Sequence, residues 1–189
     1  MKNTIKQEFN SHLKTIQDTI NHNQNILEDI AKLTIETLNN GNKILICGNG
    51  GSAADAQHFA AELTGRYKTE RAALPAIALT TDTSALTAIG NDYGYDRVFD
   101  RQLEALAQCG DLIFGISTSG NSTNIINAFN LAKEKKCKTI ALSGKNGGKI
   151  KNIADITLVV PSDNTPRIQE MHILFIHTIC QIVDNNFTN

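Results

Sequence analysis

The stretch ILICGNGGSAADAQHFAAELTGR, residues 44–66, decides the fold. It begins with a short apolar run, passes through a glycine-rich turn at 48–51 and continues as a segment rich in helix-forming residues. A buried strand, a tight turn and a helix in direct succession are typical of a parallel α/β sheet. Ligands bind such sheets where strands end and helices begin, so the turn is the first candidate binding site.

Four more apolar runs follow the first, each bounded by polar residues or glycine. The five predicted strands, buried on both faces, cover residues 43–48, 75–80, 111–116, 138–143 and 155–160. The segments between them are long enough for crossover helices, and a last helix is predicted over about 166–185. We therefore expect a three-layer α/β/α sandwich with a five-stranded parallel sheet.

The first 40 residues predict two helices, at about 4–21 and 24–40, because apolar residues recur there every three or four positions. With 189 residues, of which 41% are hydrophobic, we expect a single domain over 1–189: the N-terminal helices in 1–40 and an α/β core in 41–189.

Charge and composition exclude several classes of function. A net charge of -1 provides no basic field for nucleic acid or anionic membranes. The opening residues are too polar for a signal peptide, and no stretch approaches the roughly 20 apolar residues that span a bilayer. We expect a cytoplasmic protein without nucleic-acid or membrane partners. The four cysteines lie far apart without a CxxC pair, so we expect free, mostly buried thiols.

The glycine-rich turn fits a loose dinucleotide fingerprint, with Gly48 and Gly50 in the first two positions and Ala53 in the last. Asp82, after the second predicted strand, would supply the acidic residue that holds a ribose. The pattern is degenerate, so a dinucleotide remains one alternative for this turn.

A second loop follows the third predicted strand and opens another helix. Hydroxyls and unpaired backbone N–H groups at a helix N-terminus form a cradle for a phosphate monoester. The alternative is that Ser119 or Ser122 merely caps the helix, but capping needs only one such side chain. We favour a phosphate site made by Ser117, Thr118, Ser119 and Ser122.

His58 and Glu62 stand four residues apart, so they project from one face of the helix that follows the glycine turn. The pair can share a metal ion or a substrate, or form only a surface hydrogen bond. The last predicted helix carries Gln169, His172 and His177 among apolar residues. Either these histidines bond backbone carbonyls in the core, or the polar stripe faces the first pair and completes a site for Zn²⁺. The amide oxygen is a weak ligand, which favours a site that exchanges ligands with substrate.

Five segments carry a resemblance that covers essentially the whole chain: CGNGGSAADAQHFAAELTGRY, GNDYGYDRVF, GISTSGNS, LSGKNGG and RIQEMHILFIH. Together, in this order and spacing, they resemble phosphoheptose isomerases of the sugar isomerase (SIS) domain superfamily, which have a flavodoxin-like fold. The resemblance implies an aldose–ketose isomerase acting on sedoheptulose 7-phosphate, in which the glycine turn approaches a sugar phosphate and not a dinucleotide.

The resemblance also implies the roles of individual residues. One zinc ion per site would be held by His58, Glu62, Gln169 and His177, with Glu62 and His177 as the acid/base pair. Family members are homotetramers with active sites between subunits, which implies that the helices in 1–40 pack at the oligomer interface. The sugar phosphate would be contacted by Asn49, Gly50, Gly51, Ser52, Glu62, Asn91, Asp92, Ser117, Thr118, Ser119, Ser122 and Gln169.

The same superfamily contains a regulator without known enzyme activity, which binds the bacterial replication initiator protein. It shares GNG, the serine loop and RIQEMH, but lacks the glutamate of the His/Glu pair and has asparagine in place of the last histidine. This chain has both Glu62 and His177. A module that only binds needs no acid/base pair, so this difference favours the enzyme.

Overall fold

A five-stranded parallel sheet forms the centre of the molecule in the computed structural model, which describes residues 1–188. The strands lie in the order β2-β1-β3-β4-β5. Their bounds are β1 Ile44–Gly48, β2 Ala76–Ala78, β3 Leu112–Ser117, β4 Lys138–Gly144 and β5 Ile156–Val160. The predicted five strands and their parallel arrangement are confirmed.

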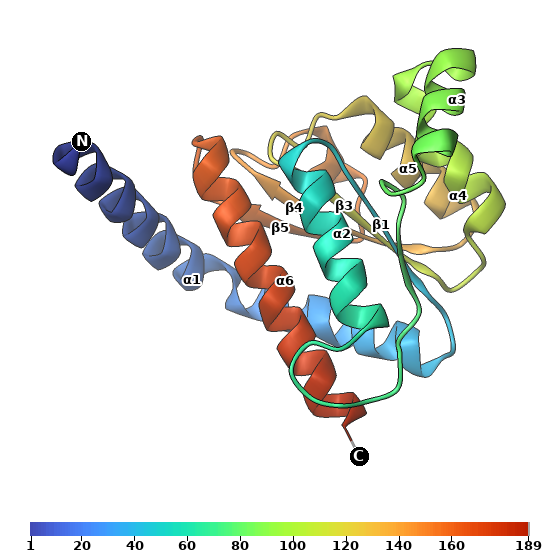
Figure 1. Cartoon of the computed structure of the whole chain (residues 1–189), viewed down its shortest axis with the longest axis horizontal. Coiled ribbons are helices and arrows are strands. Elements are labelled where there is room, and N and C mark those ends of the chain that lie inside the picture. Colours follow the sequence, from blue (N-terminus) through green and yellow to red (C-terminus); the bar gives the residue numbers. More distant parts are fainter. Residues whose placement is uncertain (189) are drawn as a thin grey trace.

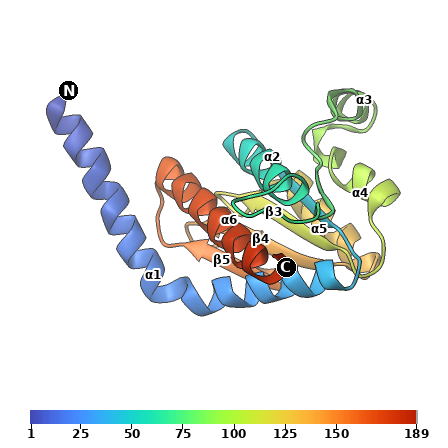
Figure 2. The ribbon, with the colours of Figure 1, turned by 60° about the horizontal axis from the view of Figure 1, so that its bottom comes forward.

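Helices cover both faces of this sheet, as Figures 1 and 2 show. One apolar cluster joins the sheet to α1 (Lys2–Asn39), α2 (Gly51–Thr64) and α6 (Thr165–Phe187). The other joins it to α4 (Asp100–Leu106) and α5 (Thr123–Glu134), with α3 (Thr83–Tyr93) at its margin. The expected three-layer sandwich is therefore confirmed.

Alternating side chains along each strand enter opposite clusters. Ile44 and Ile46 of β1 pack on the α2 and α6 side, whereas Leu45 and Cys47 pack on the α5 side. All residues of β1 are buried, as the apolar run predicted. The edge strand β2 departs from the prediction, because it contains only three residues and Ile77 at its centre is exposed.

The connection from β4 to β5 contains no α-helix. A single short 3₁₀-helix, η2 (Lys149–Asn152), spans it, although the sequence suggested crossover helices throughout. Only eleven residues separate β4 from β5, which is too few for a crossover α-helix together with the turns on either side of it. A second 3₁₀-helix, η1 (Tyr95–Arg97), links α3 to α4.

The N-terminal region forms one helix of 38 residues, so the prediction of two helices was wrong. The polar run around residues 21–25 suggested a break, but residues 2–39 contain neither glycine nor proline to stop the helix. Instead the helix bends along its course (Figure 2). The Asn23 amide donates to Thr19 O of its own helix and to Val159 O of β5, which ties this part of α1 to the sheet.

The turn after β1 and the loop after β3 begin at neighbouring strand ends, from which the chain continues in opposite directions across the sheet. The chain leaves β1 toward β2 on one side, while β3 pairs with β1 on the other, with Gly48 opposite Ile116. The turn after β1 and the loop after β3 therefore lie at the topological switch point of the sheet, where open α/β sheets bind ligands. No helix within residues 1–188 combines the length and the apolar character needed to cross a membrane.

Candidate metal and phosphate site

The turn after β1 brings α2 against α6. Gly50 has a positive φ of 58°, which glycine adopts without strain, and α2 begins at the next residue. A Cβ on Gly51 would lie 2.5 Å from Gln169 Nε2, so a larger residue here would displace the end of the Gln169 side chain. With glycine at this position, the Gln169 side chain lies against the N-terminus of α2.

Further along the same two helices, His58, Glu62 and His177 form a compact group. His58 Nε2 lies 3.0 Å from Glu62 Oε1 and 3.0 Å from His177 Nε2. One ligand atom from each residue falls within 4.8 Å of the others, and the group is open to solvent at His58. The structure therefore joins the i,i+4 pair of α2 to the last histidine of the α6 stripe.

This donor set fits a zinc ion. Two imidazoles and a carboxylate are common zinc ligands, and tetrahedral bonds of roughly 2.0–2.1 Å place ligand atoms about 3.3 Å apart. The two measured separations of 3.0 Å are close to that spacing. Three protein ligands leave a fourth position for another group, as in catalytic zinc sites.

Aromatic and acidic neighbours border the group. The Tyr67 ring stacks on His177 with centroids 5.7 Å apart and planes 27° apart. Asp55, one turn before His58, is half-buried, and burial raises the pKa of its carboxyl to about 6 although the neighbouring His58 lowers it. Asp55 Oδ2 is buried without a hydrogen-bond partner in the described part of the chain. Neither Tyr67 nor Asp55 was predicted as a site residue, although Asp55 lies on α2 and Tyr67 follows shortly after it.

His172 takes no part in this group. It is fully buried, and its Nε2 lies 3.1 Å from Ser143 O of β4. Burial lowers the pKa of the imidazole to about 4, with the bond to Ser143 acting in the opposite direction. Of the two interpretations that the sequence left open, the core histidine applies to His172 and the candidate ligand to His177.

The loop after β3 holds its hydroxyls close together at the start of α5. Ser117 Oγ lies 2.9 Å from Ser122 Oγ, and Gly120 N donates to Ser117 Oγ. Ser122 occupies the N-cap position, but its side chain caps no backbone N–H of the helix. The dipole and the N–H groups of this N-terminus are therefore available to an anion, with Ser119 at the loop tip.

A pair of amides connects the two loops. Asn49 Nδ2 donates to Asn124 Oδ1 over 3.0 Å, and Asn124 Nδ2 donates to Asn49 Oδ1 over 2.9 Å. The Tyr95 hydroxyl donates to the same Asn49 oxygen. No periodic pattern predicts a role for Asn124 or Tyr95, because their shared partner Asn49 lies 75 and 46 positions away in the chain. This bridge fixes the glycine turn relative to the serine loop.

Other predicted residues lie apart from these contacts. Asn91 and Asp92 are exposed on α3, where the Asn91 amide donates to Asp92 Oδ1 over 2.9 Å. Asp82, the candidate ribose ligand, accepts from Ala85 N as the N-cap of α3. Capping of α3 therefore accounts for an acidic residue at position 82, and no bound dinucleotide is needed to explain it. The cysteines are free, and three of the four are buried, as predicted.

Comparison with known proteins gives one family. The SIS domain model matches residues 8–144. The phosphoheptose isomerase of Aliarcobacter butzleri (strain RM4018) is 69% identical over 189 residues, covering all of both chains. Among solved structures, the phosphoheptose isomerase of Neisseria gonorrhoeae has a TM-score of 0.93 and 49% identity over 97% of this chain and 98% of that one. The enzyme from Francisella tularensis has a TM-score of 0.94 and 41% identity over 97% of each chain.

These similarities extend over the whole fold, including the glycine turn, the serine loop and the last helix. They agree with the presence of Glu62 and His177, the two residues whose absence would have indicated the regulator. The chain belongs to the phosphoheptose isomerases, a family of enzymes built on the SIS domain.

Proposed function

We propose that this enzyme converts sedoheptulose 7-phosphate to D-glycero-D-manno-heptose 7-phosphate, as the first step toward a heptose precursor for lipopolysaccharide or capsule. The observation that carries the proposal is the meeting of His58, Glu62 and His177 on α2 and α6, in a chain whose serine loop leaves the N-terminus of α5 uncapped. One end of the site offers metal-binding and proton-transfer groups. The other offers hydroxyls and N–H groups suited to a phosphate.

Isomerisation between a ketose and an aldose moves a proton between two adjacent carbons. The Glu62 carboxylate is half-buried and would take the proton from the carbon next to the carbonyl. His177 would then give a proton to the neighbouring carbon. The two roles can be exchanged, because the orientation of the sugar decides which face each residue meets.

A zinc ion held by His58, Glu62, Gln169 and His177 would supply a Lewis acid that polarises the carbonyl oxygen of the sugar. The resemblance alone assigns Gln169 to this set, because its side chain lies against Gly51, about two turns of α2 before His58. An imidazole nitrogen bound to a metal has no proton to donate. His177 would then act through Nδ1, or through Nε2 only while that atom is free.

The phosphate end supplies orientation. Ser117, Thr118, Ser119 and Ser122 would hold the phosphate, while Asn49, Gly50, Gly51 and Ser52 line the turn along the sugar. Binding energy from this distant group fixes the reacting carbons beside Glu62. Asn91 and Asp92 complete the proposed substrate contacts.

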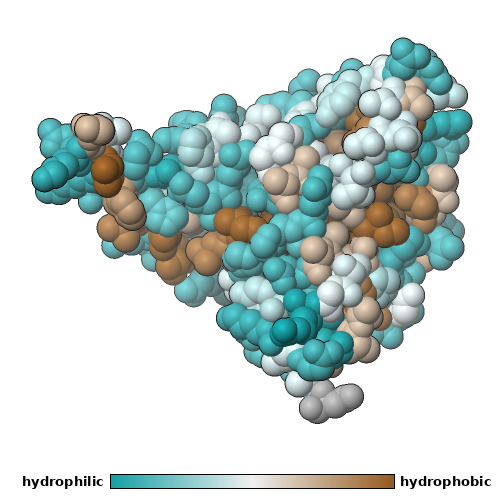
Figure 3. Space-filling model, in the orientation of Figure 1, coloured by the Kyte–Doolittle hydropathy of each residue, from teal (hydrophilic) through white to brown (hydrophobic). Residues whose placement is uncertain are grey.

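We further propose that the active form is a homotetramer in which α1 packs at the interface. Ile5, Phe9 and Leu13 are spaced four residues apart on α1 and are 56%, 68% and 57% exposed. Figure 3 shows apolar side chains along this projecting helix and beside it. An exposed apolar stripe of this length is typical of a protein–protein contact. A groove between α1 and α6 continues it, lined by residues that include Ile16, Ile20, Leu27, Met171, Leu174 and Phe175.

The test is to incubate the purified, zinc-loaded protein with sedoheptulose 7-phosphate and to follow the aldoheptose 7-phosphate by NMR. We expect conversion by the native protein and none by the His58→Ala variant, together with one zinc ion per chain in the first and loss of zinc in the second. Absence of conversion by folded, metal-loaded protein would contradict the proposed reaction.

A further inference from the structure

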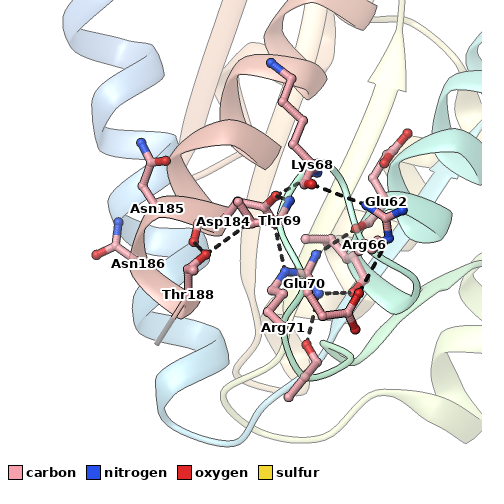
Figure 4. A network of polar contacts seen from close by, with 12 residues as sticks. Glu62, Arg66, Lys68, Thr69, Glu70, Arg71, Asp184, Asn185, Asn186 and Thr188 are labelled. Atoms are coloured by element: carbon pink, nitrogen blue, oxygen red, sulfur yellow. Dashed lines mark hydrogen bonds and ion pairs between the residues drawn. The ribbon is translucent and has the colours of Figure 1, made fainter.

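A buried ion pair lies beneath the proposed metal site, between the loop that follows α2 and the last turns of α6 (Figure 4). Arg71 Nε donates to Asp184 Oδ1 over 2.8 Å, and the two side chains are 1% and 0% exposed. Replacing such a pair with apolar side chains is often neutral or stabilising. Stability alone therefore gives little reason to bury these charges, and the bonds that surround the pair indicate another role.

Arg71 caps the C-terminal end of α2, and one of the carbonyls that it binds belongs to Glu62 of the compact group. One terminal nitrogen donates to Glu62 O over 2.8 Å, and the other donates to Leu63 O and Ala72 O, each over 3.0 Å. The last carbonyls of a helix have no partner within the helix, and a cation is favourable there. Only the forked guanidinium can bond Asp184 and the two α2 carbonyls at once. Arg71 thereby fixes the backbone from which the Glu62 side chain projects.

Asp184 fixes the loop that follows α2, near Tyr67 and His177. Its Oδ2 accepts from Lys68 N over 2.9 Å and from Thr69 N over 3.0 Å. Burial raises the pKa of this carboxyl, but those two N–H groups and Arg71 outweigh it and lower the pKa to about 2. The carboxylate thus pins the chain at residues 68–69 to α6. Tyr67, directly before this point, is held with its ring stacked on His177.

We propose that Arg71 and Asp184 are positioning residues of the metal site, a role that rests on the proposed function: the pair sets Glu62 through its backbone and His177 through Tyr67. Two of the three residues in the compact group are reached in this way, one from each helix. Within residues 1–188, no side-chain hydrogen bond of the pair reaches a metal-ligand atom of His58, Glu62 or His177. It acts by fixing the distance between α2 and α6 on the side where the loop joins them.

The test uses Arg71→Lys, which keeps the positive charge beside Asp184 but replaces the fork with a single compact donor. In metal-free protein, the ring-proton signals of His177, assigned with His177→Asn, are expected upfield because the Tyr67 ring lies against them. We expect Arg71→Lys to move these signals toward the positions seen in Tyr67→Leu. We also expect its zinc dissociation constant to rise by about tenfold or more, as for other outer partners of metal ligands. Asp184→Asn, which retains an acceptor of the same shape, is the second variant and should shift both readouts in the same direction.

The matched control is the ion pair between Lys43 and Asp111, with Nζ and Oδ2 2.6 Å apart and the carboxylate 1% exposed. It joins the residues that precede β1 and β3, and within residues 1–188 the further hydrogen-bond partners of its carboxylate, Asn42 and Gln108, are not partners of Arg71 or Asp184. Lys43→Gln should lower the melting temperature without moving the His177 signals or the zinc affinity. If Arg71→Lys and Asp184→Asn behave like this control, the pair is structural only and the positioning proposal is wrong.

The two proposals fail separately. The His177 signals are measured without metal or substrate, so they report on the positioning role even if the wild-type protein proves unable to isomerise the heptose. A wild-type enzyme that binds zinc and turns over, combined with unchanged signals and zinc affinity in both variants, would overturn the positioning role and leave the reaction intact.

Discussion

Glu62 contacts the candidate metal group through its side chain and the buried ion pair through its backbone. Its carboxylate lies 3.0 Å from His58, and its carbonyl accepts from buried Arg71. A substitution of Glu62 itself therefore tests proton transfer, whereas a substitution of Arg71, which binds the Glu62 carbonyl, tests how the Glu62 backbone is positioned. Side-chain substitutions at Glu62 should preserve the helix, because the bonds that fix its backbone remain.

Glu62→Gln should reduce kcat by at least about 100-fold, because the amide keeps the shape of the carboxylate but cannot take the proton. The assembly state, measured by light scattering, should not change. Glu70→Gln makes the same chemical change at an exposed side chain of the neighbouring loop and should leave kcat unaltered. Exchange of carbon-bound hydrogen in deuterated water should also stop in Glu62→Gln. Rapid exchange without product would assign proton removal to His177 instead.

His172 should make folding stability dependent on pH. Its pKa is about 4 in the folded protein and about 6.5 when unfolded, so the unfolded state binds more protons between these values. Stability is fully present above pH 6.5 and is lost as the pH falls toward 4. At pH 5 the loss from this group is about 2 kcal/mol. Urea unfolding at pH 7.5 and pH 5 should show a smaller loss for His172→Gln than for wild type; equal losses would contradict the assignment.

At the scale of single elements, the serine loop depends on close backbone packing. Gly120 has a φ of +65°, and a Cβ there would lie 2.0 Å from Gly147 O of the turn after β4. Gly120 O accepts from Ile150 N of η2. The turn after β4 and η2 therefore pack against the serine loop and hold its backbone in place, although they contribute none of the predicted phosphate ligands.

The double variant Ser119→Ala with Ser122→Ala should raise KM for the sugar phosphate more than it lowers kcat. Contacts to a distant phosphate are largely equal in the ground and transition states, so their loss weakens the binding of both states by a similar amount. Steady-state kinetics with sedoheptulose 7-phosphate measure the two constants. Ser162→Ala, before α6, serves as the control for loss of a loop hydroxyl. A fall in kcat with KM unchanged would give the loop a direct part in the chemistry.

Elements and their contacts were predictable to different degrees. The strands followed from local apolar runs, and the His58/Glu62 pair followed from helical spacing, because both signals lie within a few residues. The single long α1 was missed because polar residues around Asn23 resembled a break, while their bond to Val159 is a tertiary contact. Asn124, Tyr67 and Asp184 were not singled out for the same reason: each acquires its role from a partner far away in the chain.

At the scale of the whole molecule, α1 projects beyond the sandwich with its apolar stripe uncovered (Figures 1 and 3). Its attachment to α6 near the projecting end is polar: His12 Nδ1 lies 2.6 Å from Glu170 Oε2, and buried Arg167 donates to Glu8 O. The arm is therefore held in place while its apolar face remains available to another subunit.

Phe9→Lys with Leu13→Lys should break the proposed tetramer into smaller species, because two charges would be buried in an apolar contact. Analytical ultracentrifugation should show the change in mass, and activity should fall if the sites are shared between subunits. Gln7→Lys with Asn21→Lys adds the same charge at exposed positions off this stripe and should leave the mass unchanged. An intact tetramer in the first variant would exclude the stripe as the interface.

The distance in sequence between His58 and His177 governs when the site exists during synthesis. The two residues are 119 positions apart. At roughly 5–20 residues per second, a ribosome adds the second histidine on the order of ten seconds after the first. The central strand β1 must likewise wait for β3 before it gains its second neighbour. A metal ion held by all three residues of the compact group could therefore bind only after the last helix has docked. Such an ion would stabilise a finished subunit without starting its folding.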